Sequence, residues 1–151
     1  MANTQAMCTS FKTEILSGIH ALGTTVIRAG TGADTIKAAL YLASATVNAS
    51  TTAYSVTGEV SGAGYSAGGV TATNATAPTS SGTTAYWTPS ASFTYTPVTL
   101  TTSFDCVLVY NSTQSNKAIS AHTFGAQAIT AGTFVLSMPT NDSTNALIRI
   151  A

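Results

Sequence analysis

Charged residues are scarce in this sequence. Of its 151 residues only 7% are charged, and five basic side chains balance five acidic ones to a net charge of zero. An average soluble domain carries about 25% charged residues. Nucleic-acid binding needs clustered Lys and Arg to neutralise phosphates. The five basic residues are instead scattered along the chain, at Lys12, Arg28, Lys37, Lys117 and Arg149. The composition therefore argues against a nucleic-acid partner.

Groups for acid–base chemistry or metal binding are also few. His20 and His122 lie about a hundred residues apart and form no H-x-H or H-x-x-x-H spacing, although either could in principle share a metal with Asp105 or Asp142. His20 falls near the C-terminal end of a predicted helix, where a histidine is electrostatically favoured. With so few titratable groups, we predict a protein that is not an enzyme and has no cofactor and no metal site.

Long apolar runs and secretion signals are absent. The best apolar run, Cys106–Tyr110, has the length of a strand, whereas a membrane span needs roughly 18 apolar residues. The N-terminal residues lack the basic and apolar regions of a signal peptide, so we expect no membrane association and no export by that route. Cys8 and Cys106 could pair, but two cysteines in a core-forming chain are more often buried small hydrophobes.

Small residues dominate what is present. The chain holds 29 Thr, 25 Ala and 17 Ser, nearly half of its length, while the hydrophobic fraction is 44%. A chain this apolar and this weakly charged should fold.

The segment Thr9–Leu22 is the one amphipathic helix that the sequence predicts. Its apolar side chains recur at helical spacing: Phe11, Ile15, Ile19 and Leu22. Thr9 or Ser10 can cap its start, and Gly23 is a suitable end.

Strand patterns follow. Thr35–Ser44 alternates at period two, with Lys37 and Tyr41 on the face opposite the apolar residues Ile36, Ala38, Leu40 and Leu42. Helix is the alternative there, given the alanines. A strand or short helical turn is expected over Thr51–Val56, and a strand over Val70–Ala75. Six further strands are predicted after Thr83: Ala85–Thr88, Ser92–Thr96, Phe104–Asn111, Lys117–Thr123, Thr133–Met138 and Ala146–Ile150.

The spacing of these segments predicts the fold class. A turn cluster at Asn111–Asn116 makes Phe104–Thr123 a hairpin, and the segment Asn74–Thr84 has the composition of a long surface loop. Seven or eight short strands are typical of an antiparallel β-sandwich or jelly roll. We therefore predict a mainly β protein with one domain over residues 1–151, in which residues 1–23 form an N-terminal arm and helix and residues 24–151 the β domain.

The glycine-rich segment Ser61–Gly69 invites two catalytic interpretations. No Lys follows its glycines, which argues against a phosphate-binding loop. Residues 64–68 match the G-x-S-x-G pattern around Ser66, but a nucleophile elbow needs a buried strand before it and a helix after it. In a chain so short and rich in β patterns, the match is an accident of composition, and a loop is the simpler interpretation.

Aromatic residues are the best candidates for recognition. Tyr86, Trp87, Phe93 and Tyr95 could form a surface that stacks on sugars or contacts another subunit. The alternative is that one face of this group belongs to the core. Since Tyr86 and Trp87 would point to opposite sides of a strand, at least one should lie near the surface. Phe11 joins this set of contact candidates because we expect the N-terminal helix to anchor the protein to a partner.

Low charge also suggests what such a protein is for. Copies repel each other little, and a surface of Thr, Ser, Asn and Ala loses little side-chain entropy when it packs against another subunit. Edge strands with few Lys are available for pairing with neighbours. These properties suit a homo-oligomer within a large assembly.

Several segments resemble a family of small tailed-bacteriophage virion proteins. The resemblance is carried by FK.E.L.G.H at Phe11–His20, KAALY at Lys37–Tyr41, TTAYSVTGEVSGAGYSAGG at Thr51–Gly69, FDCVLVYN at Phe104–Asn111 and FVLSMPTNDSTNALIRIA at Phe134–Ala151. It implies a head decoration or cement protein of the virion, assembled in the host cytoplasm, whose partners are the major capsid protein or other virion proteins. It supplies no catalytic or binding residues.

Three functions are therefore considered. The first is a structural component that binds and stabilises the capsid lattice, with a tail or neck component as a variant. The second is a receptor- or glycan-binding module that uses exposed aromatics. The third is a small hydrolase that uses Ser66 and a histidine.

Overall fold

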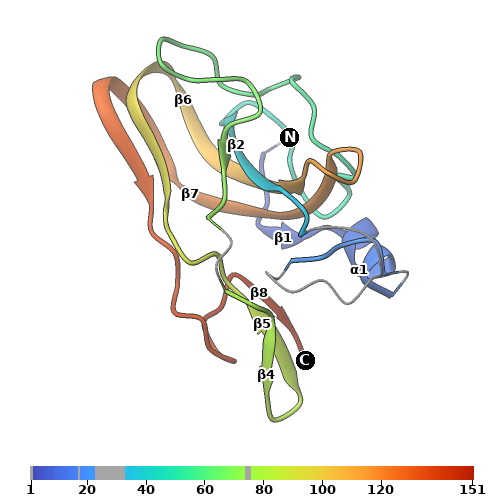
Figure 1. Ribbon diagram of the computed structural model, residues 1–151. Helices are drawn as coiled ribbons and strands as arrows, with labels where there is room; N and C mark the ends of the chain where they lie inside the picture. The colour runs from blue at the N-terminus through green and yellow to red at the C-terminus, as the bar shows by residue number, and fades with distance from the viewer. Residues whose placement is uncertain (1, 17, 23–32, 74–75) are drawn as a thin grey trace.

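A computed structural model describes residues 2–16, 18–22, 33–73 and 76–151 of the protein. These residues form two antiparallel sheets and one short helix. The larger sheet has the strand order β1-β7-β6-β2-β3 and the smaller one β4-β5-β8 (Figure 1). The elements are β1 (Ala6–Met7), α1 (Thr9–Leu16), β2 (Ile36–Leu42), β3 (Val70–Thr71), β4 (Thr79–Ser81), β5 (Thr84–Trp87), β6 (Phe93–Asn111), β7 (Lys117–Leu136) and β8 (Ile148–Ile150).

The two longest strands, β6 and β7, form one antiparallel ribbon. Their turn is the predicted one, since Asn111 pairs with Lys117 across it, and Ser115 and Asn116 adopt positive φ. The hairpin prediction is thus confirmed, but the expected breaks at residues 97–103 and 124–132 are wrong. Pairing continues through both segments across several bulges, because Thr-rich sequence is compatible with strand geometry even where it is polar.

The ribbon bends back over itself, and this bend creates the second layer of the fold (Figure 1). Phe134, near the end of β7, packs edge to face against Phe104 with ring centroids 5.1 Å apart, and lies 5.3 Å from the ring of Phe124. Register shifts in β6 between Tyr95 and Cys106, and a positive φ at Ala131, accompany the bend. The protein is therefore mainly β, with a sandwich-like arrangement, as predicted.

Strand β2 is central and buried on both faces. It pairs with β6 on one side and with β3 on the other. The prediction of a strand here is confirmed, and Tyr41, on the face opposite Ile36 and Leu40, is buried as well. The loop that follows β2 covers this residue, and the Tyr41 hydroxyl donates to the carbonyl of Ser55.

The segment Ser61–Gly69 is a loop that packs on β2 and β6. Gly69 has φ +69°, and a Cβ there would lie 1.8 Å from the carbonyl oxygen of Ala38. The loop also holds a buried carboxylate: Glu59 accepts hydrogen bonds from the hydroxyls of Tyr54 and Tyr65 and from the backbone N–H of Gly68, each at 2.7 Å. Glycine here permits close backbone approach, so its role is packing.

The helix is shorter than its apolar periodicity predicts. It ends at Leu16, because Gly18 adopts φ +67°, and the N–H groups of Gly18 and Ile19 donate to the carbonyls of Ile15 and Glu14. This is a Schellman motif, which terminates a helix. Ile19 and Leu22 therefore follow the helix instead of completing it, and Gly23 lies outside the described residues.

Several short segments also differ from expectation. Thr51–Val56 forms neither a strand nor a helical turn, apart from a bridge from Ala53 to Lys117. The strand predicted at Val70–Ala75 is reduced to β3 in the described residues. The loop predicted over Asn74–Thr84 contains β4, which pairs with β5 across a tight turn where Gly82 has φ +57°. Strand β1 was not expected, since two residues carry no periodicity.

Candidate functional site

Four of the five predicted contact residues lie in the core. Phe11 packs edge to face on His20, and Phe93 pairs with Leu136. The four buried residues are Phe11, Trp87, Phe93 and Tyr95. Burial removes the exposed aromatic recognition face that the sequence suggested, although Phe93 still lines the hollow described below. Tyr86 is half-buried and points away from the Trp87 side, as the strand alternation required.

The polar ends of the buried aromatics are satisfied internally. The Trp87 indole donates to the carbonyl of Thr76 at 2.9 Å, and the Tyr95 hydroxyl donates to that of Ala38 at 2.8 Å. Buried aromatic polar groups require such partners. These contacts explain why the residues belong to the core despite their polar atoms.

Ser66 does not form a nucleophile elbow. It is exposed in a turn in which its carbonyl accepts from the N–H of Gly69, and neither a buried strand nor a helix flanks it. Among the described residues that line the shallow hollow beside it, none is a histidine. The G-x-S-x-G match therefore lacks the strand–turn–helix setting in which such a serine acts as a nucleophile.

A second polar cluster surrounds His20, whose side chain is only 1% exposed. Its Nε2 lies 2.7 Å from Glu14 Oε2, and its Nδ1 lies 3.0 Å from Asn111 Nδ2. The Asn111 carbonyl oxygen accepts from the N–H groups of Thr113 and Gln114, so its amide nitrogen must be the donor to His20. The imidazole thus accepts at Nδ1 and donates at Nε2.

The same cluster joins the N-terminal helix to the turn of the ribbon. Lys117 Nζ lies 2.6 Å from Glu14 Oε1, and Asn111 also donates to Asp34 at 2.8 Å. Burial alone would raise the Glu14 pKa, but the hydrogen bonds from Lys117 and His20 outweigh it and hold the pKa below its usual value. Both ring nitrogens of His20 are occupied by these partners, so the cluster fastens elements together and offers no free base.

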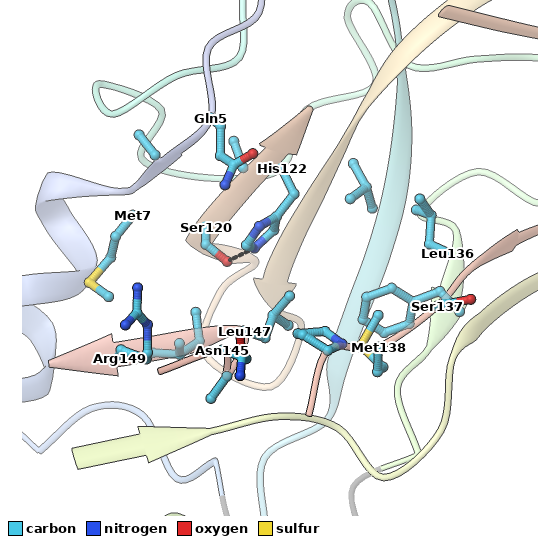
Figure 2. A pocket seen from close by; sticks show the side chains of 17 residues that line it. Gln5, Met7, Ser120, His122, Leu136, Ser137, Met138, Asn145, Leu147 and Arg149 are labelled. Carbon is cyan, nitrogen blue, oxygen red and sulfur yellow. Dashed lines mark hydrogen bonds between the residues drawn. The ribbon is translucent and has the colours of Figure 1, made fainter. Parts of the chain in front are cut away.

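A hollow with a volume of about 540 Å³ lies between the two sheets. Residues of β1, β7 and β8 and of the segments next to them surround it (Figure 2). Eleven of its 17 lining residues are apolar, among them Met7, Leu136, Met138 and Leu147. The polar side chains among its lining residues are Gln5, Ser120, His122, Ser137, Asn145 and Arg149. An apolar hollow with a few convergent polar groups is the usual form of a binding site.

A serine–histidine pair lies at the back of this hollow. Ser120 Oγ is 2.9 Å from His122 Nε2, and alternation along β7 places both side chains on one face (Figure 2). Burial lowers the pKa of His122 to about 4, so its ring is neutral near pH 7. No carboxylate is among the described lining residues. Without a charged partner to raise its basicity, the pair lacks the third member of a catalytic triad.

The two cysteines and the histidines assemble no metal centre in the described part of the chain. Cys8 and Cys106 are both buried and unpaired, as expected, and burial raises the Cys106 pKa to about 12. No group of three or more His, Cys, Asp or Glu residues comes together in a metal-binding arrangement within the described ranges. Among the described helices, none is long and apolar enough to cross a membrane.

The hollow could not be predicted from the sequence, because its lining comes from six separate stretches of the chain. One signal was available: the Ser-x-His spacing at residues 120 and 122 places two polar side chains on one strand face. The contributions of Met7 and Arg149 depend on how the two sheets meet. No protein-family model, curated protein or solved structure matches the chain.

Proposed function

We propose that this protein is a non-enzymatic structural component of a bacteriophage virion, a decoration or cement protein that binds the major capsid lattice and stabilises it. Two independent lines support the proposal. The first is the resemblance of five chain segments to small virion proteins. The second is the nature of the surface that the fold exposes.

The observation that carries the proposal is an exposed surface with little charge, and a long stretch of strand with none. Three of the five carboxylates are buried: those of Glu14, Asp34 and Glu59. Among the described charged residues, Lys12 and Arg149 are exposed, and the half-buried ones are Lys37, Asp105, Lys117 and Asp142. The bent part of the ribbon, residues 93–104 and 123–136, is half-exposed and contains no charged residue at all. A neighbour can cover such a surface without desolvating an ion.

The open edge of β7 adds to this surface. Beyond the β1 pairings at Ser120 and Ala121, β7 has β6 as its one partner strand among the described residues. Val135, on this stretch, is 47% exposed. Natural proteins usually protect such edges with Lys or Pro, or cover them with another element. An unprotected edge is suited to contact with a neighbouring subunit in a lattice.

Particle stability tests the proposal. Virions that lack this protein should release their genome at a lower temperature than complete virions, and purified protein added back should restore the difference. Equal thermal resistance of both particles would contradict the cement role. Recovery of the protein with tails after dissociation of the particles would assign it to the tail variant of the same structural class.

A further inference from the structure

The contacts of His20 fix which of its ring nitrogens carries hydrogen. Its Nε2 donates to Glu14 Oε2 at 2.7 Å, and its Nδ1 accepts from Asn111 Nδ2 at 3.0 Å. Asn111 cannot turn its amide around, because its carbonyl oxygen accepts from two backbone N–H groups of the hairpin turn, at 3.1 and 3.2 Å. The site therefore fits a neutral imidazole without hydrogen on Nδ1.

A proton on Nδ1 is incompatible with this arrangement. Two donors, the Nδ1–H of His20 and the amide of Asn111, would then face each other across 3.0 Å. The side chain of His20 is only 1% exposed, so water cannot replace Asn111 as its partner while the ring stays in place. Protonation of the ring therefore favours a conformation in which the ring has left this position.

Three charged side chains of the described residues belong to the polar cluster around His20. Glu14, from α1, attracts a positive ring, but its other carboxylate oxygen is already paired with Lys117 of β7 at 2.6 Å. Asp34, which precedes β2, already accepts from Asn111 at 2.8 Å. The described residues that line the small apolar hollow next to His20 include no charged side chain. The attraction of Glu14 is thus shared with Lys117 and does not replace the partner lost at Nδ1.

The cluster joins the C-terminal end of α1 and residues 18–22 to the turn of the β6–β7 ribbon. Phe11, which is fully buried, packs edge to face on the His20 ring, with ring centroids 4.8 Å apart. The start of α1 is held separately, since the N–H groups of Cys8 and Thr9 donate to backbone carbonyls outside the cluster. Loss of the His20 contacts would therefore open the far end of the helix and leave its start in place.

We infer that His20 is the sensor of an acid-opened contact: a proton on its Nδ1 breaks the hydrogen bond with Asn111, and residues 18–22 and the end of α1 then separate from the ribbon turn. Histidine is the side chain that ordinarily changes its charge between pH 5 and pH 8. Burial raises the pKa of Glu14, but hydrogen bonds from Lys117 and His20 outweigh it and hold the pKa below its usual value. The Glu14 carboxylate therefore stays ionised in this range and does not open the contact itself. This inference does not depend on the proposed function.

Hydrogen exchange on the full chain reports the opening. The N–H of Ala21 donates to Asp34 Oδ2 at 2.7 Å, so its protection depends on the closed contact. Between pH 8 and pH 5, its protection factor should fall by about tenfold per pH unit once His20 takes up its single proton. The protection factor corrects for the pH dependence of exchange in an unfolded chain. The N–H of Leu40, which donates to the Tyr65 hydroxyl at 3.0 Å, is the reference and should keep its protection.

The two histidines give a matched pair of variants. His20→Gln removes the sensor, so the protection factor of Ala21 should differ by less than about twofold between pH 8 and pH 5. His122→Gln removes the other histidine and should retain the full loss of protection. Thermal melting shows whether each variant is folded. Constant protection of Ala21 in the wild type, or a loss that persists in a folded His20→Gln variant, would overturn the inference.

Nitrogen NMR of the wild-type ring decides the question if His20→Gln fails to fold. At pH 8 the neutral ring should carry its hydrogen on Nε2 and none on Nδ1. On acidification, the titration of His20 should coincide with the loss of protection at Ala21, because both report the same event. A hydrogen on Nδ1 at the start, or a protonated ring in a molecule whose Ala21 N–H stays fully protected, would contradict the inference.

Discussion

Phe104 and Phe134 sit in opposite arms of the bent ribbon, and their rings meet edge to face at a centroid distance of 5.1 Å. This contact holds the second layer of the fold against the first. Phe134→Ala should lower the free energy of unfolding by about 2–4 kcal/mol, because it removes a half-buried ring from the aromatic cluster. Chemical denaturation measures this loss. Val135→Ala, at the exposed neighbouring position, should cost under about 1 kcal/mol, and equal losses would contradict the role of the cluster.

The Tyr65 hydroxyl connects the glycine-rich loop to β2. It donates to Glu59 at 2.7 Å and accepts from the N–H of Leu40 at 3.0 Å. Tyr65→Phe leaves that buried N–H without its acceptor, so we expect a loss of about 1–3 kcal/mol in the free energy of unfolding. Tyr86→Phe, on a half-buried tyrosine outside this network, is the matched control and should change stability little. If the free energy of unfolding of Tyr65→Phe is unchanged, water must replace the hydroxyl as the acceptor for the Leu40 N–H.

Close backbone approach at Gly69 can be separated from its positive φ. Gly69→Ala brings a methyl group against the Ala38 carbonyl, whereas Gly82→Ala, at φ +57°, meets no atom within 4 Å. Both variants suffer similar backbone strain, and the Gly69 variant adds a clash. The free energy of unfolding of Gly69→Ala should therefore lie more than about 2 kcal/mol below that of Gly82→Ala, as measured by chemical denaturation. Equal losses would mean that the loop shifts freely away from β2.

Protonation of His122 should destabilise the folded protein at acid pH. Its pKa is about 4 in the folded chain, below the ordinary 6.5, because burial disfavours the charged ring. The unfolded state therefore binds a proton first, so the contribution of His122 is complete above pH 6.5 and is lost as the pH falls toward 4. NMR titration of the imidazole should report the low pKa. In His122→Gln, stability should depend less steeply on pH between 6.5 and 4; an unchanged slope would contradict this assignment.

A charge placed on the bent ribbon should separate assembly from folding. Thr130 is exposed in a region without charged residues, so Thr130→Lys should leave thermal stability within about 0.5 kcal/mol of the wild type. A buried lysine at a subunit contact is costly, so the same variant should bind depleted particles much more weakly. Thr57→Lys, on an exposed loop outside the ribbon, is the control. Full particle binding by the Thr130 variant would remove the ribbon from the proposed interface.

Local patterns in the sequence predicted the class of the fold well. Alternation located β2, and the turn residues between Asn111 and Lys117 located the central hairpin, because both signals act over a few neighbouring residues. The bend of the ribbon was not predictable, since it depends on contacts such as that of Phe134 with Phe104. The helix was overextended because apolar spacing continued past Gly18, where the backbone conformation ends it.

The candidate site was largely beyond sequence reasoning. Aromatic residues drew attention to Trp87, Phe93 and Tyr95, but their hydrogen bonds and packing place them inside the protein. The hollow forms where two sheet edges meet, and that meeting depends on tertiary contacts alone. The one local sequence signal of the hollow is the spacing of Ser120 and His122, which places both side chains on the same face of β7.

The burial of Glu14, Asp34 and Glu59 has a consequence for the conditions under which contacts would survive. Mobile ions screen attractions between exposed charges, so surfaces held by ion pairs loosen as ionic strength rises. A surface of threonine, alanine and serine has few such attractions to lose. We therefore expect the affinity of contacts made by the ribbon to be nearly the same at high ionic strength as in dilute buffer.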